Sequence, residues 1–362
     1  MFIVNFFVFL PDVFYQEQMT PIYNQLLIPF ITAMALAITM GGSGTAPAFS
    51  AAYGANVIRK SIIPGLFGIV VFVGAFLAGK KTAGTMGSGI LPSEYMTFMV
   101  VSIALFSIAV TMLISNISGI PQSTSQAAVL ALAAPAVYFG KLDTQVLFAE
   151  IIPAWFILPT ISYFLSYFCG KYIYQPMRRR GLTIQRAQNE NRKHIWDIVL
   201  VVMAVYVSFA IGANNVANAA GPLYTMTINE LNIRESDHIV ILMLATLVVA
   251  PCFGIGASLF GHKILKNTGK EIILFGKFEA VIIAFISGSL LLLASLIKGI
   301  PTSLVQVNVA AILGIGVAKM GHKNIFRKTQ VKRFFTMWMI APIISFFLSL
   351  LLIFLADMLK ML

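Results

Sequence analysis

The sequence predicts an all-α polytopic membrane protein. It would contain two inverted-topology repeats of about five transmembrane helices each, ten to twelve in total, with broken or re-entrant helices at the membrane midplane. Three observations predict this fold. Apolar residues make up 59% of the chain and charged residues only 10%, whereas a soluble domain has about 25% charged residues. Ten apolar runs follow one another, and three short motifs occur twice.

Each apolar run is close to the roughly 17–25 residues that a membrane-spanning helix needs. Because lipid offers backbone groups no hydrogen-bond partner, runs of this length form helices. The runs lie at 22–40, 61–79, 96–116, 123–140, 146–170, 195–211, 238–260, 272–297, 303–320 and 335–356. We expect a first transmembrane repeat at 22–170, a basic cytoplasmic loop at 171–194 and a second, inverted repeat at 195–358. A further span at residues 1–10 would raise the count.

The two halves carry three pairs of matching motifs. Gly-Gly-Ser-Gly-Thr-Ala-Pro at 41–47 aligns with Gly-Ala-Asn-Asn-Val-Ala-Asn at 212–218, Gly-Lys-Lys at 79–81 aligns with Gly-His-Lys at 261–263, and Gly-Ile-Pro-Gln-Ser at 119–123 aligns with Gly-Ile-Pro-Thr-Ser at 299–303. Gln126 and Gln306 follow the last pair at the same spacing. The offsets are nearly equal, which indicates an internal duplication.

An odd number of spans in each half would make the second copy enter the membrane from the opposite side, as in many secondary transporters. The basic residues agree with this topology. If both termini lie outside, the inner loops hold about three times as many Lys and Arg residues as the outer ones, as the positive-inside rule requires. The net charge of +12 is therefore explained by cytoplasmic loops, and no nucleic-acid partner is expected.

The most informative motif places three asparagines at membrane depth, between Gly212 and the helix-breaking Gly221-Pro222. Polar side chains there are costly and mark functional sites, and paired interruptions in two repeats predict a transporter's binding site. Small-residue helix packing is the alternative interpretation. The candidate site residues of this motif and its partner are Asn214, Asn215, Asn218, Ser43, Gly44 and Thr45.

The Gly-Ile-Pro segments each stand just before an apolar run. Proline suits a helix start, and Ser or Thr there can cap the helix. The free N–H groups of a helix start also attract anions, so hydroxyls beside them would suit a tetrahedral oxyanion, with ordinary capping as the alternative. The candidate donors are Ser123, Thr124, Ser125, Thr302 and Ser303.

The segment at 212–223 resembles the GANDVANAxGPL signature of the inorganic phosphate transporter family, the PiT permeases. The Gly-Ile-Pro segments resemble the second conserved element of that family. The resemblance covers both halves. It implies an inverted-repeat secondary transporter that couples uptake of an oxyanion to a cation, and it implies a homodimer. We expect no cofactor and no metal.

Two departures from the phosphate pattern concern the substrate. Asn215 replaces the family's Asp, and Gly44 stands at the corresponding place in the first half. A carboxylate can accept a hydrogen bond from protonated phosphate or bind Na⁺, but it would repel sulfate, which carries no proton at pH 7. The first motif and the Ala-Tyr-Gly at 52–54 also resemble the sulfate-permease branch. The sequence therefore favours sulfate, with phosphate as the alternative.

Coupling to protons would need a titratable group within the membrane, and Glu150 and Glu279 are the candidates. A local partner such as Lys277 would give Glu279 a structural role instead. Coupling to Na⁺ would rest on Asn and Ser oxygens and backbone carbonyls. We favour protons.

A different function class is suggested by Gly41-Gly42-Ser43-Gly44, which fits the GxSG pattern of rhomboid-like intramembrane serine proteases. Such an enzyme needs a histidine at membrane depth, and all four histidines fall at the edges of apolar runs. A channel could use the same anion-binding helix ends and differs only in coupling. We therefore expect a non-enzymatic plasma-membrane permease, embedded in the lipid bilayer, that imports sulfate by proton symport with alternating access; a Na⁺-coupled phosphate symporter is the alternative.

Overall fold

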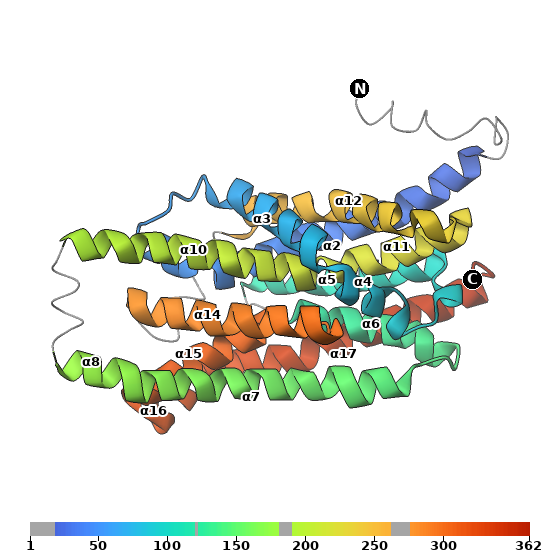
Figure 1. The fold of residues 1–362 in the computed structure, drawn as a ribbon. Helices are drawn as coiled ribbons and strands as arrows, with labels where there is room; N and C mark the ends of the chain where they lie inside the picture. Colours follow the sequence, from blue (N-terminus) through green and yellow to red (C-terminus); the bar gives the residue numbers. More distant parts are fainter. Residues whose placement is uncertain (1–18, 120–121, 181–189, 262–275) are drawn as a thin grey trace.

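The structure is a computed structural model that describes residues 19–119, 122–180, 190–261 and 276–362. Within these residues all regular secondary structure is helical. The helices form an elongated bundle in which most axes run along its length (Figure 1). The predicted all-α fold is confirmed.

The helices of the first half are α2 (Met19–Gly54), α3 (Ile63–Ala78), α4 (Lys80–Gly84), α5 (Phe98–Ser118), α6 (Thr124–Tyr138), α7 (Ile152–Phe168) and α8 (Gln175–Arg179). Those of the second half are α10 (Glu190–Asn215), α11 (Ala217–Leu231), α12 (His238–Leu259), α14 (Lys277–Leu293), α15 (Leu304–Met320), α16 (His322–Phe326) and α17 (Thr329–Met358). Short π-helical segments lie at Thr85–Gly89, Val146–Ile151, Cys169–Tyr174 and Ala294–Lys298, and 3-10 turns at Ser93–Tyr95 and Glu235–Asp237.

Each of the ten predicted runs contains a helix, but the helices are not equally long. By length and composition, seven helical segments in the described residues can cross a membrane, or eight if Ile63–Ala78 and Lys80–Gly89, bent by 78°, form one span. Helices α6 and α15 have 15 and 17 residues. They rise roughly 22 and 25 Å, less than the hydrocarbon thickness of about 30 Å, so neither crosses the bilayer alone.

The two short helices each pair with the helix before them to form a hairpin. We call α5–α6 (98–138) the first hairpin and α14–α15 (277–320) the second hairpin. The rings of Tyr95 and Phe139 pack against each other at the base of the first hairpin, with centroids 5.3 Å apart and planes tilted by 31°. Glu279 and Lys319 form an ion pair of 2.7 Å at the base of the second. Figure 1 shows the hairpins entering from opposite ends of the bundle, the second from the end at which α10 begins.

The break expected in the first motif, at residues 41–47, is absent, because α2 runs through it without interruption. The glycines there serve close helix packing. A Cβ at Gly41 would lie 2.2 Å from the carbonyl oxygen of Phe253, and one at Gly256 only 1.8 Å from that of Ile38. Helices α2 and α12 therefore touch backbone to backbone, as small-residue packing allows. The second motif is interrupted only at Val216, between α10 and α11.

Large apolar side chains cover the outside of the bundle. Leu77, Phe156, Met339 and Phe347 are each more than 60% exposed. Apolar groups on this scale are unfavourable in water and are suited to lipid. Together with the long apolar helices, they identify a multi-pass membrane protein.

Candidate functional site

The described residues at the tips of the two hairpins, 119 and 122–126 in the first and 299–306 in the second, share two structural features. Gly119 and Gly299 adopt φ angles of 70° and 66°, left-handed backbone that glycine tolerates best. Ser123 caps α6 and Ser303 caps α15: each Oγ accepts the backbone N–H three residues later, at 3.4 and 3.2 Å. The capping interpretation is therefore correct for both serines. A capping oxygen uses a lone pair, so its proton can still be donated to a ligand.

The two tips meet each other in the interior. Ser125 Oγ donates to the carbonyl of Thr302 at 3.0 Å. Gln126 Nε2 donates to Gln306 Oε1 at 3.1 Å, and Gln306 Nε2 donates back to Gln126 Oε1 at 2.8 Å. All four side chains are buried. The starts of α6 and α15 therefore face one another across the boundary between the halves.

Asn214, near the end of α10, holds the second tip in place. Its Nδ2 donates to Ser295 Oγ at 2.8 Å and to the carbonyl of Ile300 at 2.9 Å. Its Oδ1 accepts the backbone N–H of Thr302 at 3.0 Å. An amide is needed for this arrangement because both a donor and an acceptor are used.

The other two asparagines of the motif supply oxygens without partners. Asn218 Nδ2 donates to Ser125 Oγ at 3.2 Å, which ties α11 to the first tip. The Oδ1 atoms of Asn215 and Asn218 are buried and accept no hydrogen bond from the described residues, and the buried Gln122 Nε2 finds no acceptor among them. Buried polar atoms are nearly always satisfied, so these three atoms indicate places for a ligand, an ion or water.

The chemistry of the site follows from its donors and acceptors. Two helix starts bring positive dipole ends and hydroxyl groups together, which suits an anion. The contacts described above come from Asn, Gln, Ser and Thr side chains and from backbone, and none of these side chains is a carboxylate. The unpartnered amide oxygens suit a cation or a donated proton.

The first-half motif lies on α2, and its two hydroxyl groups donate to backbone carbonyls of the same helix. Ser43 Oγ donates to the carbonyl of Met40 at 3.1 Å, and Thr45 Oγ1 donates to that of Gly41 at 2.6 Å. Gly44 has Phe67 beside it. The three residues are buried, and their part in ligand binding stays a prediction. Thr124, which begins α6 beside Ser123, is likewise placed at a tip without an assigned contact.

The two coupling candidates lie in different surroundings. Glu279 is buried, pairs with Lys319 and accepts the backbone N–H of Gly276 at 2.8 Å. Its partner is therefore not Lys277, which pairs with Asp197. Glu150 is 39% exposed and lies 3.7 Å from Lys298.

Sequence reasoning missed several residues that build the site. Gln126 and Gln306 were aligned as a repeat pair, and two amides at equivalent positions could have suggested that they meet. Gln122 adjoins the predicted Ser123 and could have been included for the same reason. Ser295, which supports Asn214, has no distinguishing signal because buried serines are common in membrane helices.

Comparison with known proteins agrees with this geometry. The family model described as the phosphate transporter family matches residues 40–349. The chain is 31% identical over 328 residues to the sulfate permease CysP of Bacillus subtilis, covering 90% of this chain and 87% of that protein. The fold matches a solved structure of the sodium-dependent phosphate transporter with a TM-score of 0.77 and 20% identity, covering 92% of this chain and 99% of that one.

Proposed function

The chain belongs to the phosphate transporter family, and on that premise we propose that it imports sulfate across the plasma membrane. Membership makes it a membrane transporter and not an enzyme. The interpretation of Ser43 as a protease nucleophile is therefore wrong, and its hydroxyl instead donates to the carbonyl of Met40 in its own helix.

The observation that carries the proposal is the meeting of two helix starts among uncharged side chains. Ser125 and Thr302 join the tips, and Asn214 and Asn218 hold them. Sulfate needs hydrogen-bond donors and no acceptor, since it has no proton to give at pH 7. A carboxylate in this place would cost binding through like-charge repulsion. The relative from B. subtilis, named as a sulfate permease, supports the same choice of substrate.

Uptake of a dianion against the membrane potential needs a cation, and we propose symport with protons as the first candidate. Glu279 and Glu150 are the titratable groups to test. A Na⁺-coupled phosphate symporter is the second candidate, and one observation favours it: the unpartnered Oδ1 atoms of Asn215 and Asn218 are hard oxygen ligands of the kind that Na⁺ prefers.

We propose that transport proceeds by alternating access, with the two halves moving about the place where the hairpin tips meet. The two hairpins enter from opposite ends (Figure 1), which supports an inverted repeat even though α6 and α15 do not cross. The basic loop at 171–194 would lie in the cytoplasm and both termini outside. Homodimer formation remains a proposal from the family resemblance.

The test is uptake of labelled sulfate and labelled phosphate into proteoliposomes, with proton and Na⁺ gradients imposed separately. Sulfate accumulation driven by inward protons is the expected result. Phosphate accumulation driven by Na⁺ would overturn the proposed substrate and coupling ion. Flux that never exceeds equilibrium under either gradient would indicate a channel.

A further inference from the structure

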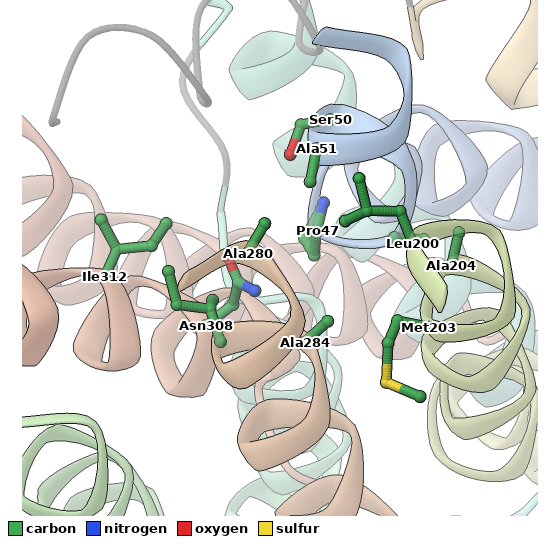
Figure 2. Close-up of a pocket in the computed structure, with 12 residues that line it drawn as sticks. Pro47, Ser50, Ala51, Leu200, Met203, Ala204, Ala280, Ala284, Asn308 and Ile312 are labelled. Atoms are coloured by element: carbon green, nitrogen blue, oxygen red, sulfur yellow. The ribbon is translucent and has the colours of Figure 1, made fainter. Parts of the chain in front are cut away.

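A surface groove lies at the end of the long helical segment Val146–Arg179, which is apolar enough to cross the membrane. The volume of the groove is about 200 Å³, several times the roughly 30 Å³ that one water molecule occupies in the liquid. A second cavity, between α2, α10, α14 and α15 (Figure 2), has a volume of about 20 Å³, room for a single water molecule. The groove, unlike this cavity, can therefore hold a solute of the size of a phosphate group.

The described residues that line the groove are basic or uncharged. They are Lys171, Gln175, Pro176, Arg179 and Arg180. The three basic residues are exposed, and none of them forms an ion pair with a carboxylate in the part of the chain that the structure describes. Cations that share one groove repel one another, and an anion bound between them removes this repulsion. The charge of the groove therefore favours an anionic ligand.

The donors of the groove suit a phosphate group in particular. The planar guanidinium groups of its two arginines can each give two parallel hydrogen bonds to phosphate oxygens. The Nζ of Lys171 lies over the rings of Tyr167 and Tyr172, 5.6 and 5.4 Å from their centroids, so its charge is held at the groove. Gln175 donates to the backbone carbonyl of Ala318, which ties this helix to α15. The groove is therefore supported by the fold on both sides of its basic residues.

An aromatic row, Phe164, Phe168 and Tyr172, runs along the same helix from the groove toward the middle of the membrane span. The three rings stack in succession, with centroids 6.3 and 6.1 Å apart, and all three are exposed on the outside of the bundle. Exposed aromatic side chains at this level of a span lie against lipid. A phospholipid could therefore place its phosphate in the groove and its acyl chains along the aromatic row, whereas a free inorganic anion would use the groove alone.

We propose that the groove binds the phosphate group of an anionic phospholipid. Lys171, Arg179 and Arg180 hold the headgroup, and the aromatic row holds the acyl chains. Basic residues at a membrane surface attract anionic lipids, each contributing to the affinity, and the three here converge on one groove. The bound lipid fixes the end of the α7–α8 segment at the level of the headgroups. This site is separate from the hairpin tips, so the inference holds whichever anion the protein carries.

The experiment measures the affinity of the purified protein in detergent for short-chain phosphatidylglycerol and for phosphatidylcholine of the same chain length. We expect the parent protein to bind phosphatidylglycerol at least about tenfold more tightly. The variant Lys171→Gln/Arg179→Gln/Arg180→Gln should bind the two lipids with similar affinity, because its groove has lost its positive charge. Equal affinities in the parent protein would overturn the proposal whatever the variant does.

The matched control removes the same charge from the same end of the bundle. Lys323 and Arg327, at α16, and Lys332, near the start of α17, are exposed, and α16 lies at the end of the bundle where α8 ends (Figure 1). The variant Lys323→Gln/Arg327→Gln/Lys332→Gln should keep the preference for phosphatidylglycerol. Equal losses in the two triple variants would show a general attraction to a basic surface and would overturn the groove as the site.

A second arm separates a lipid from a free anion. Glycerol phosphate and sulfate, which have no acyl chains, are added as competitors at the concentration of the lipid. They should leave the bound phosphatidylglycerol in place, and Phe168→Ser/Tyr172→Ser should weaken lipid binding severalfold through lost apolar contact. Displacement by glycerol phosphate or sulfate would make the groove a site for free anions and overturn the lipid assignment. The measurement involves no transport, so a failure of the sulfate-import proposal would leave it unchanged.

Discussion

Gln126 and Gln306 bond to each other through both ends of their amides, at 3.1 and 2.8 Å, although 180 residues separate them. Each lies in the first turn of a short helix, in equivalent positions of the two halves. If the two halves are the inverted repeats that the sequence predicts, equivalent residues that contact each other lie beside the axis that relates them. The two halves therefore meet at these amides, between the hairpin tips.

The stability losses from replacing the two glutamines should not be additive: the double variant should lose less than the two single variants together. Gln126→Met or Gln306→Met preserves side-chain length and leaves the other amide buried without its partner, at a cost of about 1–3 kcal/mol. The double variant removes both polar groups and should lose less than the sum of the single losses. Thermal unfolding of the purified protein in detergent measures all three, and strictly additive losses would contradict the pairing.

Ser303→Ala should lower sulfate uptake strongly while reducing the stability of the protein only slightly. The change removes the cap of α15, which costs about 1 kcal/mol, and removes a hydroxyl that we assign to the oxyanion. We expect sulfate uptake to fall at least about tenfold at unchanged expression. The control is Ser349→Ala, which removes an equally buried hydroxyl that donates to the carbonyl of Ala131 at 2.8 Å, away from the tips. Equal uptake by the two variants would remove Ser303 from the site.

Gly256→Leu should prevent α2 and α12 from packing. Even a Cβ at this position would lie 1.8 Å from the carbonyl oxygen of Ile38, and overpacking typically costs 1–3 kcal/mol or more. Gly65→Leu is the matched control, since a Cβ there meets nothing within 4 Å. The yield of monodisperse protein and its unfolding temperature should fall for the first variant only. A normal unfolding temperature for Gly256→Leu would show that the two backbones are not in contact.

We predict that Glu279 contributes to the stability of the fold through its ion pair with Lys319. Glu279→Gln leaves the Lys319 charge without its carboxylate in the interior, and breaking a buried pair costs about 3–5 kcal/mol. Glu150→Gln, at an exposed pair, should cost at most about 1 kcal/mol. The double variant Glu279→Gln/Lys319→Met should recover stability and proton-driven sulfate uptake. A double variant that folds but no longer responds to the proton gradient would instead assign the coupling proton to Glu279.

The sequence predicts the helices well because a lipid environment requires long apolar segments to be helical. Hydropathy locates all ten segments, since backbone groups in lipid must bond within their own helix. It does not distinguish a crossing helix from one arm of a hairpin, because α6 and α15, with 15 and 17 residues, are apolar and fall close to the lower limit of about 17 residues for a span. The sequence also does not reveal that α2 is continuous through 41–47. Glycines are found both where a helix breaks and where two helices pack closely, as Gly41 does against Phe253.

The chemistry of the site is predictable from the sequence, whereas its connections are not. The repeated Gly-Ile-Pro motifs and the three asparagines indicate candidate site residues, and the structure brings Ser125, Asn218, Asn214 and Thr302 together. The bonds from Asn214 to Ser295 and to Ile300 depend on how α10 packs against the second hairpin. Such tertiary contacts join residues more than 80 positions apart, and they leave no periodic signal in the chain.

The central claim, that an uncharged site selects sulfate, is tested most directly by the ratio of sulfate to phosphate uptake in the parent protein and in Asn215→Asp. The Oδ1 of Asn215 is buried and has no partner within the part of the chain that the structure describes, and Asp has nearly the same shape as Asn, so the substitution adds a negative charge with little steric change. We predict a parent that prefers sulfate and a variant whose preference falls at least about tenfold, since a carboxylate repels sulfate and accepts a proton from phosphate. A parent that prefers phosphate, or a ratio unchanged by Asn215→Asp, would contradict the account.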